Sequence, residues 1–94
     1  MSKYYPADFL RMIRNQIPIE RVIVIMLNME VRDTSKWLRF RCPLCYNFHT
    51  ATNRNTNLAR CFDCKENFNS IDMVMAVGEC SFMEAVEYLK ENMR

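Results

Sequence analysis

The chain carries two pairs of cysteines whose spacing is typical of a metal site. Cys42 and Cys45 form one C-x-x-C pair, and Cys61 and Cys64 form the second after fifteen intervening residues. Each C-x-x-C turn places two thiolates on one side of a metal ion, so two such turns complete a tetrahedral set. Because four protein ligands leave no open position for water, the spacing predicts one structural Zn2+ per chain.

Three other uses of these thiols stay open from the spacing: two disulfides, a thioredoxin-type redox pair, or an iron site. The N-terminal segment lacks an apolar signal core, which favours a reducing compartment and therefore metal over disulfides. No βαβ pattern flanks either pair, as a thioredoxin-type pair requires. We expect Cys80 to be a small buried apolar side chain, and His49 to be a surface histidine on a strand.

Length and composition exclude several classes of protein. Ninety-four residues make one small domain, which we expect to span residues 1–94. With Gly78 as its single glycine, the chain has no glycine-rich phosphate loop, which argues against a nucleotide-fuelled enzyme. The longest apolar run, Val22–Leu27, falls well short of the roughly 18 residues of a membrane span. We therefore expect a cytoplasmic protein that is not an enzyme and binds neither a membrane nor a small-molecule substrate.

Apolar periodicity predicts a small α+β domain in three parts. These parts are a helical lead-in over residues 6–28, a zinc ribbon of short antiparallel β hairpins over 35–68, and a helical pair over 69–93. Pro18 fits poorly inside a central strand, so the β-branched run Val22–Leu27 is expected to be a short buried helix. The strands of the ribbon are expected at residues 37–41, 48–52 and 58–62.

Capping signals mark both helices of the C-terminal pair. Asn69 followed by Asp72 predicts the start of the first helix, and Ser81 followed by Glu84 predicts a capping box for the second. Gly78 is expected to end the first helix in the left-handed conformation.

Positive charge is concentrated around the cysteines. From Lys36 to Arg60 there are five basic residues and no acid, whereas residues 69–94 carry five acids and two bases. Alternation along a strand places Trp37, Arg39 and Arg41 on one face, which suits single-stranded nucleic acid because bases stack on rings while phosphates meet positive charge. The alternative is that the aromatic residues are core and the arginines only solvate a strand. The candidate nucleic-acid residues are Lys36, Trp37, Arg39, Arg41, Arg54 and Arg60.

The order of these motifs resembles the N-terminal zinc-binding domain of bacterial DnaG-type primases. The C-P-L-C pair, the C-F-D-C pair, the aliphatic stretch Ile71–Met75 and the S-F-M-E-A run from Ser81 are similar to the motifs of that family. The resemblance covers residues 6–92 and implies a zinc ribbon flanked by helices that contacts single-stranded template. It also implies that the four paired cysteines are the zinc ligands. Primer synthesis in the family belongs to a separate toprim-type domain, which does not fit in this chain.

The chain departs from the family pattern on both sides of the ribbon. Cys45 stands where the family usually has histidine, which gives an all-thiolate site. The family's Lys-Thr-Pro-Ser-Phe run after the first pair is Phe48–Thr52 here. The family's glycines after the second pair are Lys65, Asn67 and Phe68, so the turn into the next helix must differ.

Two functions from different classes follow. The first is a non-catalytic, free-standing module that binds single-stranded DNA as an accessory subunit of a separate primase or polymerase. The second is a protein-interaction adaptor that docks a replication protein such as a polymerase or helicase, with zinc purely structural. The acidic C-terminal helices and the eight methionines support the second hypothesis.

Overall fold

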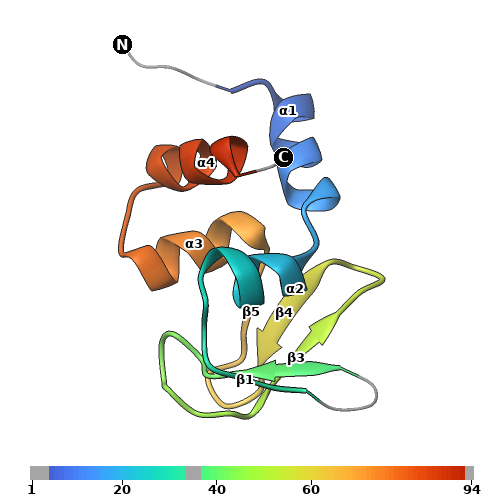
Figure 1. Ribbon diagram of the computed structural model, residues 1–94, viewed down its shortest axis with the longest axis vertical. Helices are drawn as coiled ribbons and strands as arrows, with labels where there is room; N and C mark the ends of the chain where they lie inside the picture. Colours follow the sequence, from blue (N-terminus) through green and yellow to red (C-terminus); the bar gives the residue numbers. More distant parts are fainter. Residues whose placement is uncertain (1–4, 34–36, 93–94) are drawn as a thin grey trace.

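The computed structural model describes residues 5–33 and 37–92 as a small α+β fold, with the helices gathered at one end and the strands at the other (Figure 1). Its helices are α1 (Ala7–Gln16), α2 (Ile19–Arg21), the π-helical turn η1 (Val22–Met26), α3 (Ser70–Gly78) and α4 (Phe82–Glu91). Its strands are β1 (Val31–Asp33), β2 (Leu38–Phe40), β3 (Thr50–Asn53), β4 (Leu58–Cys61) and β5 (Glu66–Phe68). The predicted fold class is confirmed.

The helical lead-in changes direction at Pro18. Ile17 leaves α1 with an extended backbone, ψ 112°, and Pro18 precedes the short helix α2. α2 continues directly into η1, so the prediction of a helix rather than a strand for Val22–Leu27 is confirmed. The prediction that this helix is buried is wrong for most of its length: only Val22 and Ile23 are buried and Ile25 is 64% exposed, because a single helical turn presents one side to the core.

The strands form two antiparallel sheets. β1 pairs with β2 with Arg32 opposite Arg39, and β3, β4 and β5 form the second sheet in sequence order. The predicted strands at 37–41, 48–52 and 58–62 correspond to β2, β3 and β4, and the hairpin between β3 and β4 is confirmed. β1 and β5 were not predicted, because strands of three residues carry too little alternation to be recognised.

Two threonine hydroxyls join one sheet to the other. Thr50 Oγ1 accepts a hydrogen bond from the Phe40 N–H at 2.8 Å and donates one to the Phe40 carbonyl at 2.6 Å. Thr52 Oγ1 accepts from the Leu38 N–H at 3.3 Å. Both threonines are buried. Hydroxyl groups of β3 therefore form the hydrogen bonds with the edge of β2 that the backbone of a neighbouring strand would otherwise form.

Capping boxes begin both C-terminal helices, as predicted. The Asn69 side chain accepts from the Asp72 N–H at 2.8 Å, and the Asp72 carboxylate accepts from the Asn69 N–H at 3.1 Å. Ser81 and Glu84 exchange the same two bonds at 3.1 and 2.9 Å. These bonds satisfy backbone donors that the first turn of a helix leaves free, which fixes where each helix starts.

The end of α3 differs from the prediction. Gly78 is the last helical residue, and Glu79 adopts the left-handed conformation with φ 51°. The helix runs one residue further than expected because the Glu79 N–H still bonds to the Met75 carbonyl. Cys80 follows as a half-buried residue whose thiol donates to the Val74 carbonyl at 3.7 Å, so it is less buried than predicted.

The core lies between the helices and the inner faces of the strands. Cys42 and Cys61, one from each C-x-x-C pair, are fully buried within it. The largest fully buried side chains around them are Phe40, Ile13, Ile19, Ile23, Ile71, Met73 and Leu89. Because two of the paired thiols lie inside the apolar core, the metal centre and the core form one structural unit.

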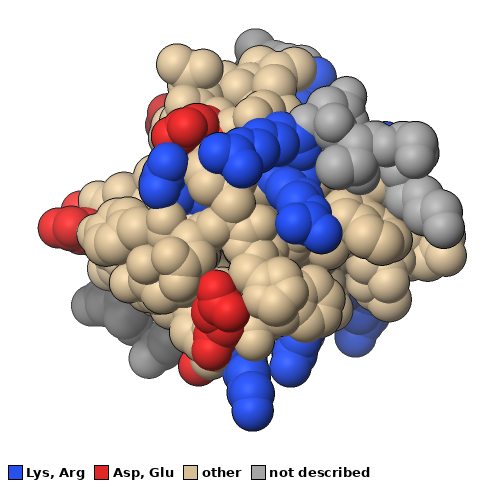
Figure 2. Space-filling view, turned by 90° about the horizontal axis from the view of Figure 1, so that it is seen from below, with Lys and Arg blue, Asp and Glu red and all other residues tan. Residues whose placement is uncertain are grey.

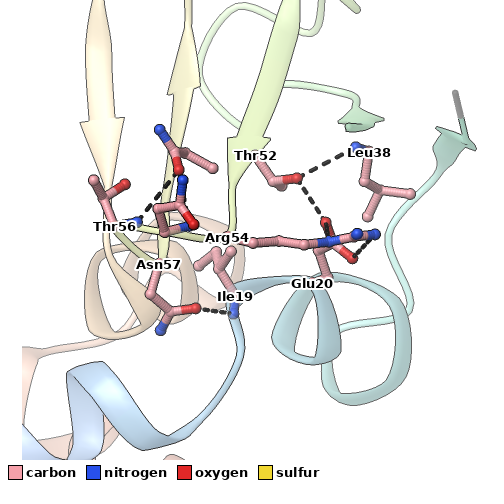
Figure 3. A network of polar contacts seen from close by, with 9 residues as sticks. Ile19, Glu20, Leu38, Thr52, Arg54, Thr56 and Asn57 are labelled. Carbon is pink, nitrogen blue, oxygen red and sulfur yellow. Dashed lines mark hydrogen bonds and ion pairs between the residues drawn. The ribbon is translucent and has the colours of Figure 1, made fainter. Parts of the chain in front are cut away.

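A carboxylate ties the lead-in to the ribbon (Figure 3). Glu20 accepts from Thr52 Oγ1 at 2.9 Å and from the Arg54 guanidinium at 3.0 and 3.2 Å. The Arg54 hydrogen bond is the main cause that lowers the pKa of Glu20; burial opposes it, and the Thr52 hydroxyl adds to it. Glu20 therefore stays ionised at neutral pH and holds α2 against β3.

We expect Glu20→Gln to destabilise the chain by about 1 kcal/mol at neutral pH, because charge-assisted hydrogen bonds become neutral ones. A lowered folded-state pKa means that this stabilisation is complete above the ordinary glutamate pKa of about 4.3 and is lost only as pH falls below it. Urea unfolding at fixed zinc should therefore give the same difference from wild type throughout a range of about pH 5–8. Glu87→Gln, at an exposed position of α4, is the matched control. A difference that shrinks between pH 8 and pH 5 would contradict this assignment.

Asn57, at the end of the same β3–β4 turn, also fastens the hairpin to the lead-in. Its Oδ1 accepts from the Ile19 N–H at 2.8 Å, and its Nδ2 donates to the Arg14 and Ile17 carbonyls at 2.7 and 2.8 Å. The residue has φ 57°, a left-handed conformation that asparagine tolerates better than most residues. One side chain thus caps the end of α1 and the start of α2.

Candidate metal centre and basic groove

The four paired cysteines converge on one point. Cys42 follows β2 and Cys61 ends β4, so each sheet delivers one C-x-x-C turn to the site. The four Sγ atoms lie within 4.8 Å of one another, and the Cys42–Cys64 and Cys45–Cys61 pairs are 3.5 Å apart. A tetrahedron with zinc–sulfur bonds of about 2.3 Å has sulfur–sulfur edges of about 3.8 Å. The thiols are therefore arranged as a zinc ion requires.

Backbone donors point at the sulfur atoms inside each turn. The Leu44 N–H lies 3.4 Å from Cys42 Sγ, and the Cys64 N–H lies 3.5 Å from Cys61 Sγ. Both turns end in a left-handed residue, Tyr46 with φ 66° and Lys65 with φ 59°. Lys65 is one of the positions where the resemblance implies glycine, and here a lysine adopts the left-handed conformation.

Without a metal ion, the four close thiols cannot all lose their protons. Burial raises the pKa of Cys61, but the Cys64 N–H, the neighbouring thiols and the Asp63 N–H outweigh it and bring that pKa to about 7. Contact with the Cys61 thiol, followed by burial and the other thiols, raises the pKa of Cys64 to about 12. One thiol thus loses its proton readily while another keeps it. A divalent cation resolves this conflict by replacing the protons.

The fifth cysteine and the histidine lie apart from the metal set. The group of metal-binding side chains within the described residues consists of the four paired cysteines. His49 is exposed immediately before β3, with Nδ1 2.9 Å from the Asp63 carboxylate and its ring 5.4 Å from that of Phe62. The prediction of a surface histidine is confirmed, although the residue precedes the strand instead of lying on it.

The family model described as CHC2 zinc finger, the zinc ribbon of DnaG, matches residues 5–94. The chain belongs to the CHC2 zinc-finger family. A comparison with curated proteins found no match. In this CHC2 zinc finger four cysteines, Cys45 among them, are positioned to bind zinc, and both the predicted cofactor and the predicted resemblance are confirmed. It is a primase-type zinc-binding module.

Beside the zinc site, the ribbon of this CHC2 zinc finger forms an open groove with a volume of about 710 Å³. Four of the predicted nucleic-acid residues line it: Trp37, Arg39, Arg54 and Arg60. Phe62, which lies between the second pair of ligands, lines the same groove and is 44% exposed. No acid lies among the described residues that line the groove. The strand end of the molecule accordingly shows more blue surface than red (Figure 2).

The arginines of the groove differ in how they are held. The Arg39 Nε atom is buried and has no hydrogen-bond partner within the described part of the chain. Arg60 donates to Asn67 Oδ1 at 3.1 Å and lies 5.7 Å from the centre of the Phe62 ring. Arg54 is paired with Glu20, which offsets its charge. Arg39 and Arg60 are therefore the groove cations best placed to meet an anion.

Two predicted residues fall outside this groove. Arg41 does not share it with Trp37 and Arg39: it pairs with Glu30 at 3.0 Å, donates to the Tyr46 carbonyl at 2.7 Å and stacks over the Phe48 ring at 4.5 Å. β2 ends at Phe40, and these three contacts hold the Arg41 side chain outside the groove. Lys36 lies outside the described residues.

Sequence reasoning did not include Phe62 and Asn67 among the site residues. Phe62 was detectable in principle, since the two central residues of a C-x-x-C turn point away from the metal and an aromatic residue there is held at the surface. Asn67 lies on β5, which was not predicted, so no sequence signal placed it beside Arg60.

Proposed function

We propose that this module binds single-stranded DNA in the basic groove. The observation that carries the proposal is the lining of the groove, which combines two exposed aromatic rings with arginines and no acid among the described residues. Trp37 and Phe62 are 38% and 44% exposed, although burying such rings would stabilise the fold. Bases stacked on them contribute about 1–3 kcal/mol each, and this stacking tolerates any sequence.

The arginines supply the second half of the interaction. Arg39 lines the groove and supplies positive charge for a phosphate, and Arg60 already lies over the Phe62 ring on which a base would stack. Asparagines and threonines along the same groove offer further neutral donors without fixing a base sequence. The groove therefore favours a flexible single strand.

We further propose that the chain acts as one non-catalytic domain over residues 1–94, a cytoplasmic accessory subunit of a separate primase or polymerase in DNA replication or primer synthesis. The closed thiolate set supports this role, since it leaves no coordination position for water or substrate. Among the described residues no helix is long and apolar enough to cross a membrane.

The test is fluorescence anisotropy of a labelled single strand with the zinc-loaded protein at several salt concentrations. Arg39→Glu combined with Arg60→Glu is expected to weaken binding at least tenfold and to lower the log–log salt slope by about 0.7 for each phosphate that the variant no longer neutralises. Arg11→Glu and Lys90→Glu together are the matched control, because both residues are exposed on helices away from the groove. Binding that is absent or independent of salt would refute the proposal, as would an equal loss in the control.

A second function, docking of a partner protein, is favoured by a separate observation. Leu44 and Tyr46 on the first C-x-x-C turn are 52% and 65% exposed and lie outside the basic groove. The two functions are compatible, since they use different faces of the ribbon.

A further inference from the structure

The first C-x-x-C turn and α3 enclose two adjacent hollows, which together we call the turn–α3 surface. Leu44, Met75 and Cys80 are among the residues that line one hollow, which has a volume of about 420 Å³. Met29, Pro43 and Tyr46 are among those that line the other, which has a volume of about 240 Å³. Both hollows share Ala76 and Glu79 at the end of α3, so they lie next to each other.

This surface exposes large apolar side chains that the fold does not use. Leu44 and Tyr46 are at least half exposed, and neither is a zinc ligand or part of the buried core. The Tyr46 position is also costly for the backbone, because a bulky residue adopts φ 66° there. Exposed apolar residues beside a concave, partly apolar surface are typical of protein–protein contact sites.

The charge of the turn–α3 surface is opposite to that of the basic groove. Its lining includes the acids Glu30, Glu66, Asp72 and Glu79. The one arginine among the described residues of the lining, Arg41, is already paired with Glu30. A partner that places positive charge around apolar side chains therefore gains electrostatic attraction here, while nucleic acid is repelled.

The zinc site holds both faces in fixed relation. The first turn carries Leu44 and Tyr46 to the acidic side, and the second turn carries Phe62 to the basic groove. Each turn contributes two of the four sulfur atoms of the site. A surface fixed in this way loses little conformational entropy when it binds.

We propose that the turn–α3 surface docks a cationic segment of a partner protein, one in which lysine or arginine flanks two apolar anchor residues. The anchors enter the two hollows, and the flanking cations meet Glu66, Asp72 and Glu79. This interaction does not depend on the DNA-binding function; it rests on the partner-docking function proposed above and specifies the chemistry of the partner.

The probe is a pair of labelled synthetic helical peptides of about 15 residues with identical leucine positions, one with lysine and the other with glutamate at the remaining sites. Binding to zinc-loaded 15N-labelled protein is followed by anisotropy and by amide chemical shifts. We expect the lysine peptide to bind and to shift amides of residues 42–46 and 75–80, and the glutamate peptide to bind at least tenfold more weakly.

Two variants distinguish this interaction from nonspecific binding. We expect binding of the lysine peptide to weaken at least fivefold in each of two variants, the double substitution Leu44→Ser with Tyr46→Ser and the single substitution Glu79→Lys. Glu91→Lys, with the same charge change at an exposed position of α4, should leave it unchanged. Unchanged unfolding midpoints confirm that each variant folds. Absence of binding, equal binding of both peptides, or shifts confined to the basic groove would overturn the proposal, whatever the outcome for DNA.

Discussion

Removal of zinc is expected to abolish the cooperative fold of this chain. Structural zinc contributes about 10–16 kcal/mol of apparent binding free energy in small zinc domains, whereas a small domain has a total stability of about 5–15 kcal/mol. The site joins two sheets that share no backbone ladder among the described residues, and two of its ligands lie in the core. Without the ion, no metal–sulfur bonds link the two C-x-x-C turns that the sheets bring together.

Metal analysis of the purified protein should give one zinc per chain. Chelation followed by circular dichroism and thermal unfolding should show loss of the cooperative transition, with recovery when zinc is added back. Cys61→Ser should behave as the chelated protein does. Cys80→Ser is the matched control, because it removes the same atom from a half-buried position outside the metal set; its transition should remain cooperative. A full native signal after complete chelation would contradict a structural role for the metal.

Local signals along the chain predicted the metal centre and the helix starts. The cysteine spacing predicted which thiols converge because a C-x-x-C turn is a short-range structure, and the capping boxes depend on residues three positions apart. The end of α3 was misplaced by one residue, since the hydrogen bond from Glu79 rather than the glycine decides it. Features that depend on one sheet approaching the other, such as the position of Arg41, had no such local signal.

Net charge is a poor guide to the proposed DNA interaction. The chain has a formal charge of +2, and four thiolates with one divalent ion contribute two negative charges, so the metallated protein is nearly neutral. The separation into a basic groove and an acidic turn–α3 surface creates the local field instead. Such a field decays within about 10 Å at moderate salt, which confines its effect to the groove itself.

Two hydroxyls of β3 bond to the edge of β2, and removal of the one that makes two of these bonds, on Thr50, is expected to destabilise the fold strongly. Thr50 is 1% exposed, and its Oγ1 atom serves both the N–H and the carbonyl of Phe40. Valine has the same shape but no hydroxyl, so Thr50→Val leaves two buried backbone groups without partners. Each such group costs about 1–3 kcal/mol, so the two together predict a loss of about 2–6 kcal/mol in the free energy of unfolding.

Urea unfolding at fixed free zinc measures this loss, and two substitutions isolate its cause. Thr50→Ser keeps the hydroxyl and removes a methyl group, so it should cost only about 1 kcal/mol. Thr56→Val makes the same hydroxyl-to-methyl change at an exposed turn position and should be nearly neutral. If valine at position 50 proved as stable as serine, the two sheets would be held together by apolar packing and zinc alone. We expect the serine variant to be clearly more stable than the valine variant. That order would show that the β3 hydroxyls hold β2 beside the second sheet, in place of backbone hydrogen bonds between the two strands.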